Sequence, residues 1–94
     1  MPVPSRAEID QQLKTLDGWK CEGNALRKQF TFAGFPEAVN FVQRLVPEAE
    51  QSDHHPDITI NYRRVTLSYS THSEGGVTMK DVDGARMADR IARG

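Results

Sequence analysis

Residues 58 to 69 carry apolar side chains at every second position, in two runs, 58–62 and 65–69, on either side of the pair Arg63-Arg64. Successive side chains of a β-strand point to opposite faces, so a period of two is typical of a strand with one buried face. A tight turn near Arg63-Arg64 would join the two runs into an antiparallel hairpin. The apolar face of this hairpin has to be covered by other elements of the chain.

A short helix is predicted near the N-terminus. Ser5 and Glu8 have the spacing of a capping box, in which each side chain satisfies a backbone N–H of the other residue. Apolar residues then recur at helical spacing as far as Leu16, and Gly18 is a suitable point for the helix to end.

A second pair of strands follows. Residues 19–22 and 25–32 have strand-like patterns, and Gly23-Asn24 between them is a two-residue hairpin signal. Lys28 interrupts the apolar face of the longer run. We therefore expect its side chain to snorkel or to lie near an edge of the sheet.

A longer helix is predicted from Gly34 to about Asp53. Pro56 disfavours helical geometry at His55, which places the end of the helix before that residue. The apolar stripe of this helix consists of Phe35, Ala38, Phe41, Val42, Leu45, Val46 and Ala49.

Thr78 and Asp81 are expected to cap a last helix, after a loop over residues 71–76. The order of elements is then α-β-β-α-β-β-α. Helices must lie on one face of a four-stranded antiparallel sheet to cover its apolar side. The sequence therefore predicts an α+β fold in a single domain, residues 1–94.

Charge and cysteine content restrict the function. The net charge of −1 argues against a dedicated nucleic-acid binder, which usually has a basic excess. A single cysteine, Cys21, excludes an intrachain disulfide and a multi-cysteine metal site, and fits a reducing compartment. The sequence has no apolar run typical of a signal peptide or of a membrane span. We expect the protein to be cytoplasmic.

Two of the three histidines, His54 and His55, are adjacent at the junction between the long helix and the hairpin. The third, His72, follows the last strand. Because the start and the finish of a hairpin lie side by side, His72 is expected close to this pair. Glu50 lies one helical turn before His54, and Asp81 lies in the first turn of the last helix. Three imidazoles and two carboxylates are thus expected to share one pocket mouth.

Such a set suits proton transfer. Histidine changes charge near neutral pH, and a carboxylate beside it fixes the tautomer and stabilises the imidazolium. Spacing alone leaves simpler explanations open: the histidines can be surface residues, Asp81 a helix cap and Glu50 a solvated side chain. A zinc site is less favoured, because adjacent histidines on extended backbone point to opposite faces and no HExxH or CxxC is present.

The full set resembles the signature of the pterin-4a-carbinolamine dehydratases. The matching positions are Glu50-x-x-x-His54-His55-Pro56, then Tyr62, His72 and Asp81. The resemblance extends to chain length, element order, the stretches LDGWK and FTFAGF, and the terminal helix. A His-His-Pro triplet alone would be a weak signal, whereas the complete spaced set is specific.

The resemblance implies an enzyme that dehydrates 4a-hydroxytetrahydropterin to quinonoid dihydropterin and water. This reaction serves tetrahydropterin recycling after a pterin-dependent aromatic amino acid hydroxylase has turned over. The family uses no metal or organic cofactor and assembles as homodimers or homotetramers. A small-molecule pterin is thus the expected partner, with neither nucleic acid nor membrane.

The resemblance also assigns roles within the site. The residues that it implies are His54, His55 and His72 as the catalytic set, His55 and Pro56 as substrate contacts, and Glu50 and Asp81 as residues that orient the histidines. We expect His54 and His72 to transfer protons and His55 to help hold the pterin.

Two other functions stay open. The chain could be a non-catalytic protein-interaction module of the same fold, or an accessory protein for a pterin or the molybdenum cofactor. The three histidines favour the enzyme, because a pure scaffold has no physical need to place them together. Open sheet edges would let two copies join edge to edge.

Overall fold

The structure is a computed structural model that describes residues 6–94, apart from the side chains of Arg6 and His72. Ser5, one half of the predicted capping box, lies outside the described residues. The elements are α1 (Arg6–Leu13), β1 (Lys20–Glu22), β2 (Ala25–Thr31), α2 (Phe35–Ser52), β3 (Asp57–Asn61), β4 (Arg64–Tyr69), the short 3-10 helix η1 (His72–Glu74) and α3 (Met79–Arg93). The predicted α+β class and element order are confirmed. The one addition is η1, in the predicted loop.

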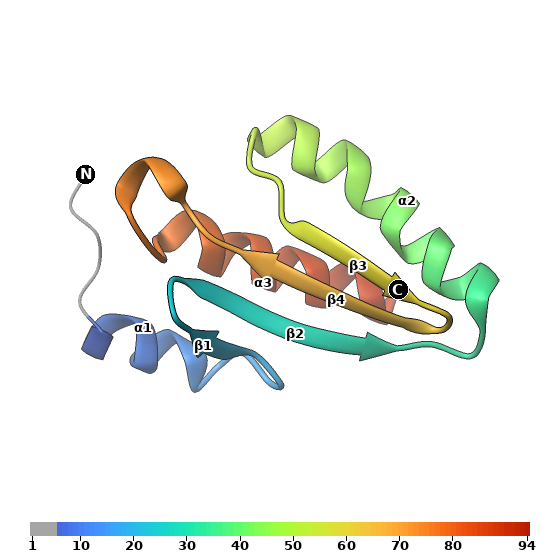
Figure 1. Cartoon of the computed structure of the whole chain (residues 1–94), viewed down its shortest axis with the longest axis horizontal. Coiled ribbons are helices and arrows are strands. Elements are labelled where there is room, and N and C mark those ends of the chain that lie inside the picture. The colour runs from blue at the N-terminus through green and yellow to red at the C-terminus, as the bar shows by residue number, and fades with distance from the viewer. Residues whose placement is uncertain (1–5) are drawn as a thin grey trace.

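The four strands form one antiparallel sheet in the order β1-β2-β4-β3. Each hairpin contributes one central strand and one edge strand. Figure 1 shows α3 running behind the central strands β2 and β4, with α2 beside it toward β3. The sheet is therefore completed only when the second hairpin docks on the first.

The core lies between the two central strands and the two long helices. The register places Leu26 opposite Tyr69 and Phe30 opposite Val65, so that both central strands turn their apolar side chains to the helices. Phe41 of α2 meets Phe30 with ring centroids 5.0 Å apart. The core residues with no exposed surface are Leu26, Ala38, Phe41, Val65, Leu67, Tyr69, Val82, Ala85 and Ala88.

Strand β3 departs from the prediction that both strands of the second hairpin bury one face. Ile58 and Ile60 are 41% and 39% exposed. β3 is an edge strand, and the buried residues of the helices cover the inner strands instead. Tyr62 also leaves the predicted alternation, because it lies in the turn after β3 with a positive φ of 57°.

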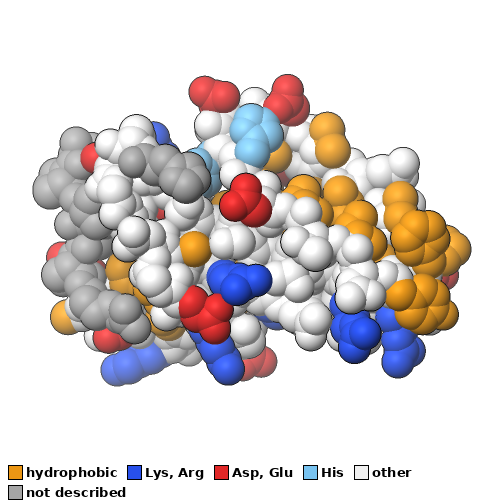
Figure 2. Space-filling model, in the orientation of Figure 1, with side chains coloured by type: hydrophobic (Ala, Val, Ile, Leu, Met, Phe, Trp, Pro, Cys, Tyr) orange, Lys and Arg blue, Asp and Glu red, His pale blue; other side chains and the backbone are white. Residues whose placement is uncertain are grey.

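Helix α2 likewise buries only part of its predicted stripe. Ala38, Phe41, Leu45 and Ala49 are buried, and Val42 packs partly against the core. The other two members, Phe35 and Val46, are 52% and 54% exposed. Figure 2 shows hydrophobic side chains along the β3 side of the molecule and at the end where β3 turns into β4. An apolar surface thus extends over β3 and the neighbouring part of α2.

The chain between α1 and β1 is held by turns and not by a longer helix. α1 ends at Leu13, earlier than the predicted stop, and successive i to i+3 hydrogen bonds then lead to Trp19. Gly18 has a φ of +82°, a left-handed conformation that glycine adopts without steric cost. The predicted glycine stop therefore marks the last turn before the sheet.

Lys28 lies on the apolar face of β2, and its side chain extends out of the core to polar partners, in agreement with the prediction. Its ammonium group lies 2.9 Å from Oδ1 of Asp89 and 2.8 Å from the carbonyl oxygen of Asp17. The indole N–H of Trp19 donates to the same Asp89 carboxylate, at 3.0 and 3.1 Å. One carboxylate thereby fastens the chain before β1 and the middle of β2 to α3.

Candidate active site

The end of α2 sets the directions of the two adjacent histidines. Asp53 caps the helix in a left-handed conformation with a φ of 53°, which aspartate tolerates better than most residues. The N–H of His54 still donates to the carbonyl of Ala49, at 3.2 Å. The chain then turns away from the helix axis, and His54 and His55 reach different partners. Figure 2 shows histidine side chains at this junction of α2 and β3.

His54 points inward to a buried carboxylate. Its Nε2 atom lies 2.5 Å from Oδ1 of Asp81, which has no exposed surface. An ionised carboxylate can only accept hydrogen bonds, so the imidazole presents Nε2–H to it. In the neutral imidazole this arrangement leaves Nδ1 as the basic nitrogen.

Asp81 is itself fixed by the start of α3. Its Oδ2 atom accepts hydrogen bonds from the hydroxyl of Thr71, at 2.9 Å, and from the N–H of Thr78, at 2.8 Å. The hydroxyl of Thr78 in turn accepts from the N–H of Lys80, so the predicted cap of Thr78 and Asp81 takes the form of a capping box. Both carboxylate oxygens are therefore engaged, and the carboxylate cannot rotate without losing a partner.

His55 points outward to Glu50. Its Nε2 atom makes a hydrogen-bonded contact with Oε2 of that residue, and both side chains are exposed. Helical spacing predicts Glu50 on the face of His54, whereas Glu50 contacts His55 in the structure. The reason is the left-handed Asp53, which interrupts the helical spacing between Glu50 and the histidines.

The remaining two predicted site residues flank these pairs. Pro56 is half-buried and connects His55 to β3. His72 begins η1, directly after Thr71, whose side chain contacts Asp81. The backbone thus brings His72 to the same end of the sheet, and its side chain lies outside the described part of the structure.

Tyr69 is a member of the site that sequence reasoning assigned only to the core. Its ring stacks on His54 with centroids 5.9 Å apart and an interplanar angle of 22°. Burial, with a smaller contribution from the negative charge of Asp81, raises the pKa of Tyr69 to about 12. The phenol is therefore a neutral group at physiological pH. A buried position at the end of a strand next to the histidines was the only signal for it.

A cavity of about 300 Å³ opens between the end of α2 and the flank of α3. The residues around it are Ser52, His54, Lys80, Asp83, Gly84 and Met87. His54 therefore has the buried carboxylate on one side and a ligand-sized space on another. Small-molecule pockets start at about this volume.

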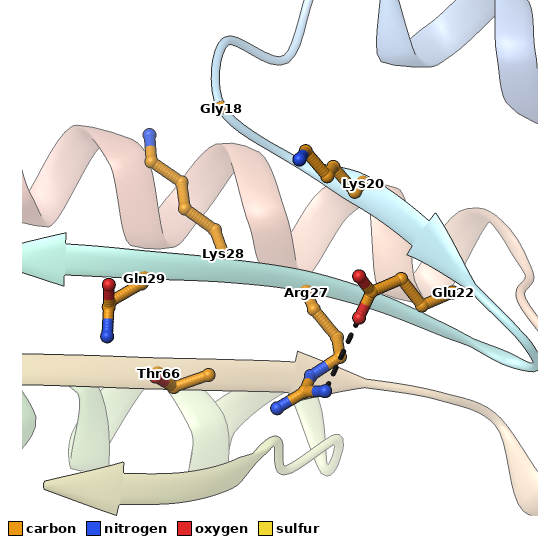
Figure 3. Close-up of a pocket in the computed structure, with 7 residues that line it drawn as sticks. All are labelled: Gly18, Lys20, Glu22, Arg27, Lys28, Gln29 and Thr66. Carbon is orange, nitrogen blue, oxygen red and sulfur yellow. Dashed lines mark hydrogen bonds and ion pairs between the residues drawn. The ribbon is translucent and has the colours of Figure 1, made fainter.

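A larger depression, of about 390 Å³, lies elsewhere, over β1, β2 and β4 (Figure 3). Arg27 and Gln29 point to one side of β2 there, and Lys28 points to the other. Arg27 pairs with Glu22 at 3.3 Å, and both side chains are at least half exposed. This depression is open, and none of the predicted site residues lines it.

Metal binding and membrane insertion are two other functions on which the described residues bear. Among the side chains that the structure describes, no three of histidine, cysteine, aspartate or glutamate gather in a way that would hold a metal ion. Within residues 6–94, no helix has the length and apolar character needed to cross a membrane.

Comparison with known proteins identifies the family. Residues 2–91 match the family model described as pterin 4 alpha carbinolamine dehydratase. The chain belongs to this family. A Sulfolobus acidocaldarius protein with the provisional name pterin-4-alpha-carbinolamine dehydratase is 48% identical, over 89% of this chain and 92% of its own length. A Thermosynechococcus vestitus protein of the same provisional name is 47% identical, over 94% and 93%.

Solved structures agree in fold. A Brucella melitensis protein described as a transcriptional coactivator/pterin dehydratase superposes with a TM-score of 0.92 at 36% identity, covering 96% of this chain and 98% of that one. A pterin dehydratase-like protein, identified as a RuBisCO assembly factor in the alpha-carboxysome, has a TM-score of 0.68 at 22% identity, covering 80% and 89%. The second likeness shows the fold alone.

Proposed function

We propose that this protein dehydrates 4a-hydroxytetrahydropterin to quinonoid dihydropterin and water, as a step of tetrahydropterin recycling. Membership of the pterin carbinolamine dehydratase family supports this class of reaction. The observation that carries the proposal is the pair of His54 and the buried Asp81 beside a ligand-sized cavity. The pair supplies a proton-transfer group whose Nε2 atom is bonded to a carboxylate, where a small molecule can reach it.

The reaction needs two proton transfers. The bond between carbon 4a and the hydroxyl oxygen breaks, and a proton must reach that oxygen so that it leaves as water. A ring nitrogen loses its proton, and the electron pair of its N–H bond forms the new carbon–nitrogen double bond. No oxidant or reductant is consumed, so histidines on two sides of the pterin are sufficient equipment.

We assign these transfers to His54 and His72. With Nε2–H directed at Asp81, His54 takes or gives a proton at Nδ1, while Asp81 stabilises the imidazolium. His72 starts η1 next to Thr71, so its backbone lies at the same end of the sheet. Neighbouring titrating groups share protons, so the two histidines act as one unit.

His55 and Pro56 hold the substrate in this proposal, and Glu50 orients His55. The His55–Glu50 pair is exposed and directly follows His54 in the chain, so we assign it the polar edge that the heterocycle meets. The pterin itself supplies the reacting atoms, and the chemistry above requires no metal or organic cofactor.

The test is the decay of 4a-hydroxytetrahydropterin followed by ultraviolet absorbance, with the substrate generated in situ by a phenylalanine hydroxylase. Reactions contain no added protein, the wild type, His54→Ala or His72→Ala. We expect the wild type to accelerate the decay above the spontaneous rate and each variant to lose most of that acceleration. A wild-type rate equal to the spontaneous rate would refute the proposal and favour an interaction module or a cofactor accessory protein.

We also propose that the protein works in the cytoplasm as a homo-oligomer, downstream of a pterin-dependent hydroxylase. The exposed apolar side chains of β3 and α2 support self-association, because an uncovered apolar edge strand favours pairing with another copy.

A further inference from the structure

We propose that Tyr69 is a positioning residue of this site: its ring holds the His54 imidazole in the plane in which it meets Asp81, and Gly84 is the position that admits the ring. This inference rests on the proposed function, to which it adds a residue that acts through His54.

The hydrogen bond from His54 to Asp81 fixes one atom of the imidazole and does not by itself fix the plane of the ring. A change of the ring plane would redirect Nδ1, the nitrogen to which the proposed function assigns proton transfer. The stacked ring of Tyr69, at an interplanar angle of 22° and 5.9 Å between centroids, removes this freedom. Offset stacking at this separation is a favourable arrangement of aromatic rings. The two contacts together define where Nδ1 points.

Tyr69 is held just as firmly from its other side. The ring has no exposed surface, and it also packs on Trp19 with centroids 6.0 Å apart. A β-carbon on Gly84 would lie 2.6 Å from Cε1 and 2.9 Å from Cζ of the tyrosine ring, closer than real β-carbons come. The ring therefore occupies the space that a side chain at position 84 would need.

Glycine inside a helix is unfavourable relative to alanine, so its presence within α3 needs a reason. Here the reason is the ring of Tyr69. Since Gly84 and His54 both line the cavity, the ring lies directly behind its wall. Because Tyr69 contacts both Gly84 of α3 and the His54 ring, the orientation of the imidazole depends on how α3 packs against Tyr69.

The hydroxyl group gives a matched control. It is buried and has no hydrogen-bond partner among the residues that the structure describes. Tyr69→Phe removes only this group and keeps the stacked ring. We expect this variant to melt at the same or a higher temperature, because a buried unpaired hydroxyl is unfavourable.

Two further variants separate positioning from packing. Tyr69→Leu removes the stack and leaves space beside Gly84, and the double variant Tyr69→Leu/Gly84→Ala refills that space without restoring the stack. We expect both to lower kcat by about tenfold with a smaller change in KM, because a misdirected catalytic group slows the chemical step. The double variant should recover melting temperature relative to Tyr69→Leu but not kcat.

The His54 ring N–H gives a readout that is independent of turnover. In the wild type, we expect its proton NMR signal at low field, as for an imidazole N–H bonded to a carboxylate, and the signal should persist in Tyr69→Phe. In the double variant it should broaden or disappear. A double variant with wild-type kcat and an unchanged signal would overturn the inference. This test does not depend on Tyr69→Leu, so it also holds if that single variant fails to fold. A wild type without dehydratase activity refutes the proposed function instead, and the NMR comparison then still decides whether Tyr69 orients His54.

Discussion

The Nε2 atom of His54 lies 2.5 Å from Oδ1 of Asp81, although 27 positions separate the two residues in the chain. The other oxygen of the same carboxylate closes the capping box at the start of α3. One buried side chain thus begins a helix and orients an imidazole. Helix formation and assembly of the site are therefore linked.

Replacement of Asp81 by asparagine tests this link. An amide has one acceptor oxygen instead of two, so it cannot accept from Nε2–H of His54 and also from the Thr71 and Thr78 donors through separate oxygens. We expect Asp81→Asn to lose about 1–3 kcal/mol of unfolding free energy and to lower kcat by about 100-fold or more. Urea unfolding and the decay assay measure the two effects.

Thr78→Ala is the matched control, because it removes a helix cap and leaves the contact of His54 with Asp81 in place. This variant should lose about 1 kcal/mol of stability and keep most of the activity. Equal losses of activity in both variants would mean that Asp81 acts only through the stability of α3.

His55 and Glu50 should behave differently from His54, because their contact is exposed. Exposed ion pairs contribute about 0–1 kcal/mol, so His55→Ala and Glu50→Ala should unfold at nearly the wild-type urea concentration. We expect His55→Ala to raise KM about tenfold with a smaller effect on kcat, which is the pattern of lost substrate binding. A fall in kcat at constant KM would instead assign proton transfer to His55.

The Asp89 carboxylate should be important for stability rather than activity. Asp89→Ala removes the partner of both the Lys28 ammonium and the Trp19 indole N–H, in a partly buried place. We expect a loss of about 2–3 kcal/mol in urea unfolding, with the activity of the folded protein retained. Glu22→Ala, which breaks the exposed pair with Arg27, is the control and should cost less than about 1 kcal/mol. Similar losses of unfolding free energy in both variants would show that the partly buried network of Asp89 stabilises the fold no more than the exposed pair does.

The sequence predicts those parts of the fold that depend on local spacing. The period of two in residues 58–69 and the apolar stripe of α2 place the second hairpin and the long helix, because each pattern is a property of neighbouring residues. Burial of β3 is not predictable in this way. Which strand the helices cover depends on the order β1-β2-β4-β3, and that order is set by long-range packing.

The candidate site shows the same division. The sequence brings the histidines and both carboxylates to one end of the sheet, because the second hairpin starts and finishes at that end. It mispairs Glu50 with His54, since a single left-handed residue, Asp53, redirects both imidazoles. Tyr69 is not predicted as a site residue, because its role depends on a ring contact with His54 that residue spacing in the sequence does not indicate.

The apolar edge strand predicts self-association. Ile58 and Ile60 share the uncovered core face of β3, and Thr59 points to the opposite face of the strand. We expect sedimentation of the wild type at micromolar concentration to show an oligomer, and Ile60→Lys to shift it to monomer, because a charge cannot be buried in that contact without a partner. Thr59→Lys is the control and should stay oligomeric. A monomeric wild type would refute self-association through this surface.

The free energy of unfolding at alkaline pH should depend on the buried phenol of Tyr69. The folded-state pKa of Tyr69 is about 12, above its ordinary value of about 10. Below pH 10 the phenol is protonated in both the folded and the unfolded chain, so the full stability is present. Between pH 10 and 12 the unfolded chain gives up this proton while the folded chain keeps it, and the free energy of unfolding falls as pH rises.

We expect Tyr69→Phe to remove this part of the fall in unfolding free energy, whereas Tyr62→Phe, at the exposed tyrosine, should retain it. Tyr62→Phe also leaves Tyr69 as the only tyrosine of the chain, so its ionisation can be followed directly by phenolate absorbance. Ionisation at the ordinary value in the folded protein would contradict the burial of the phenol beside Asp81.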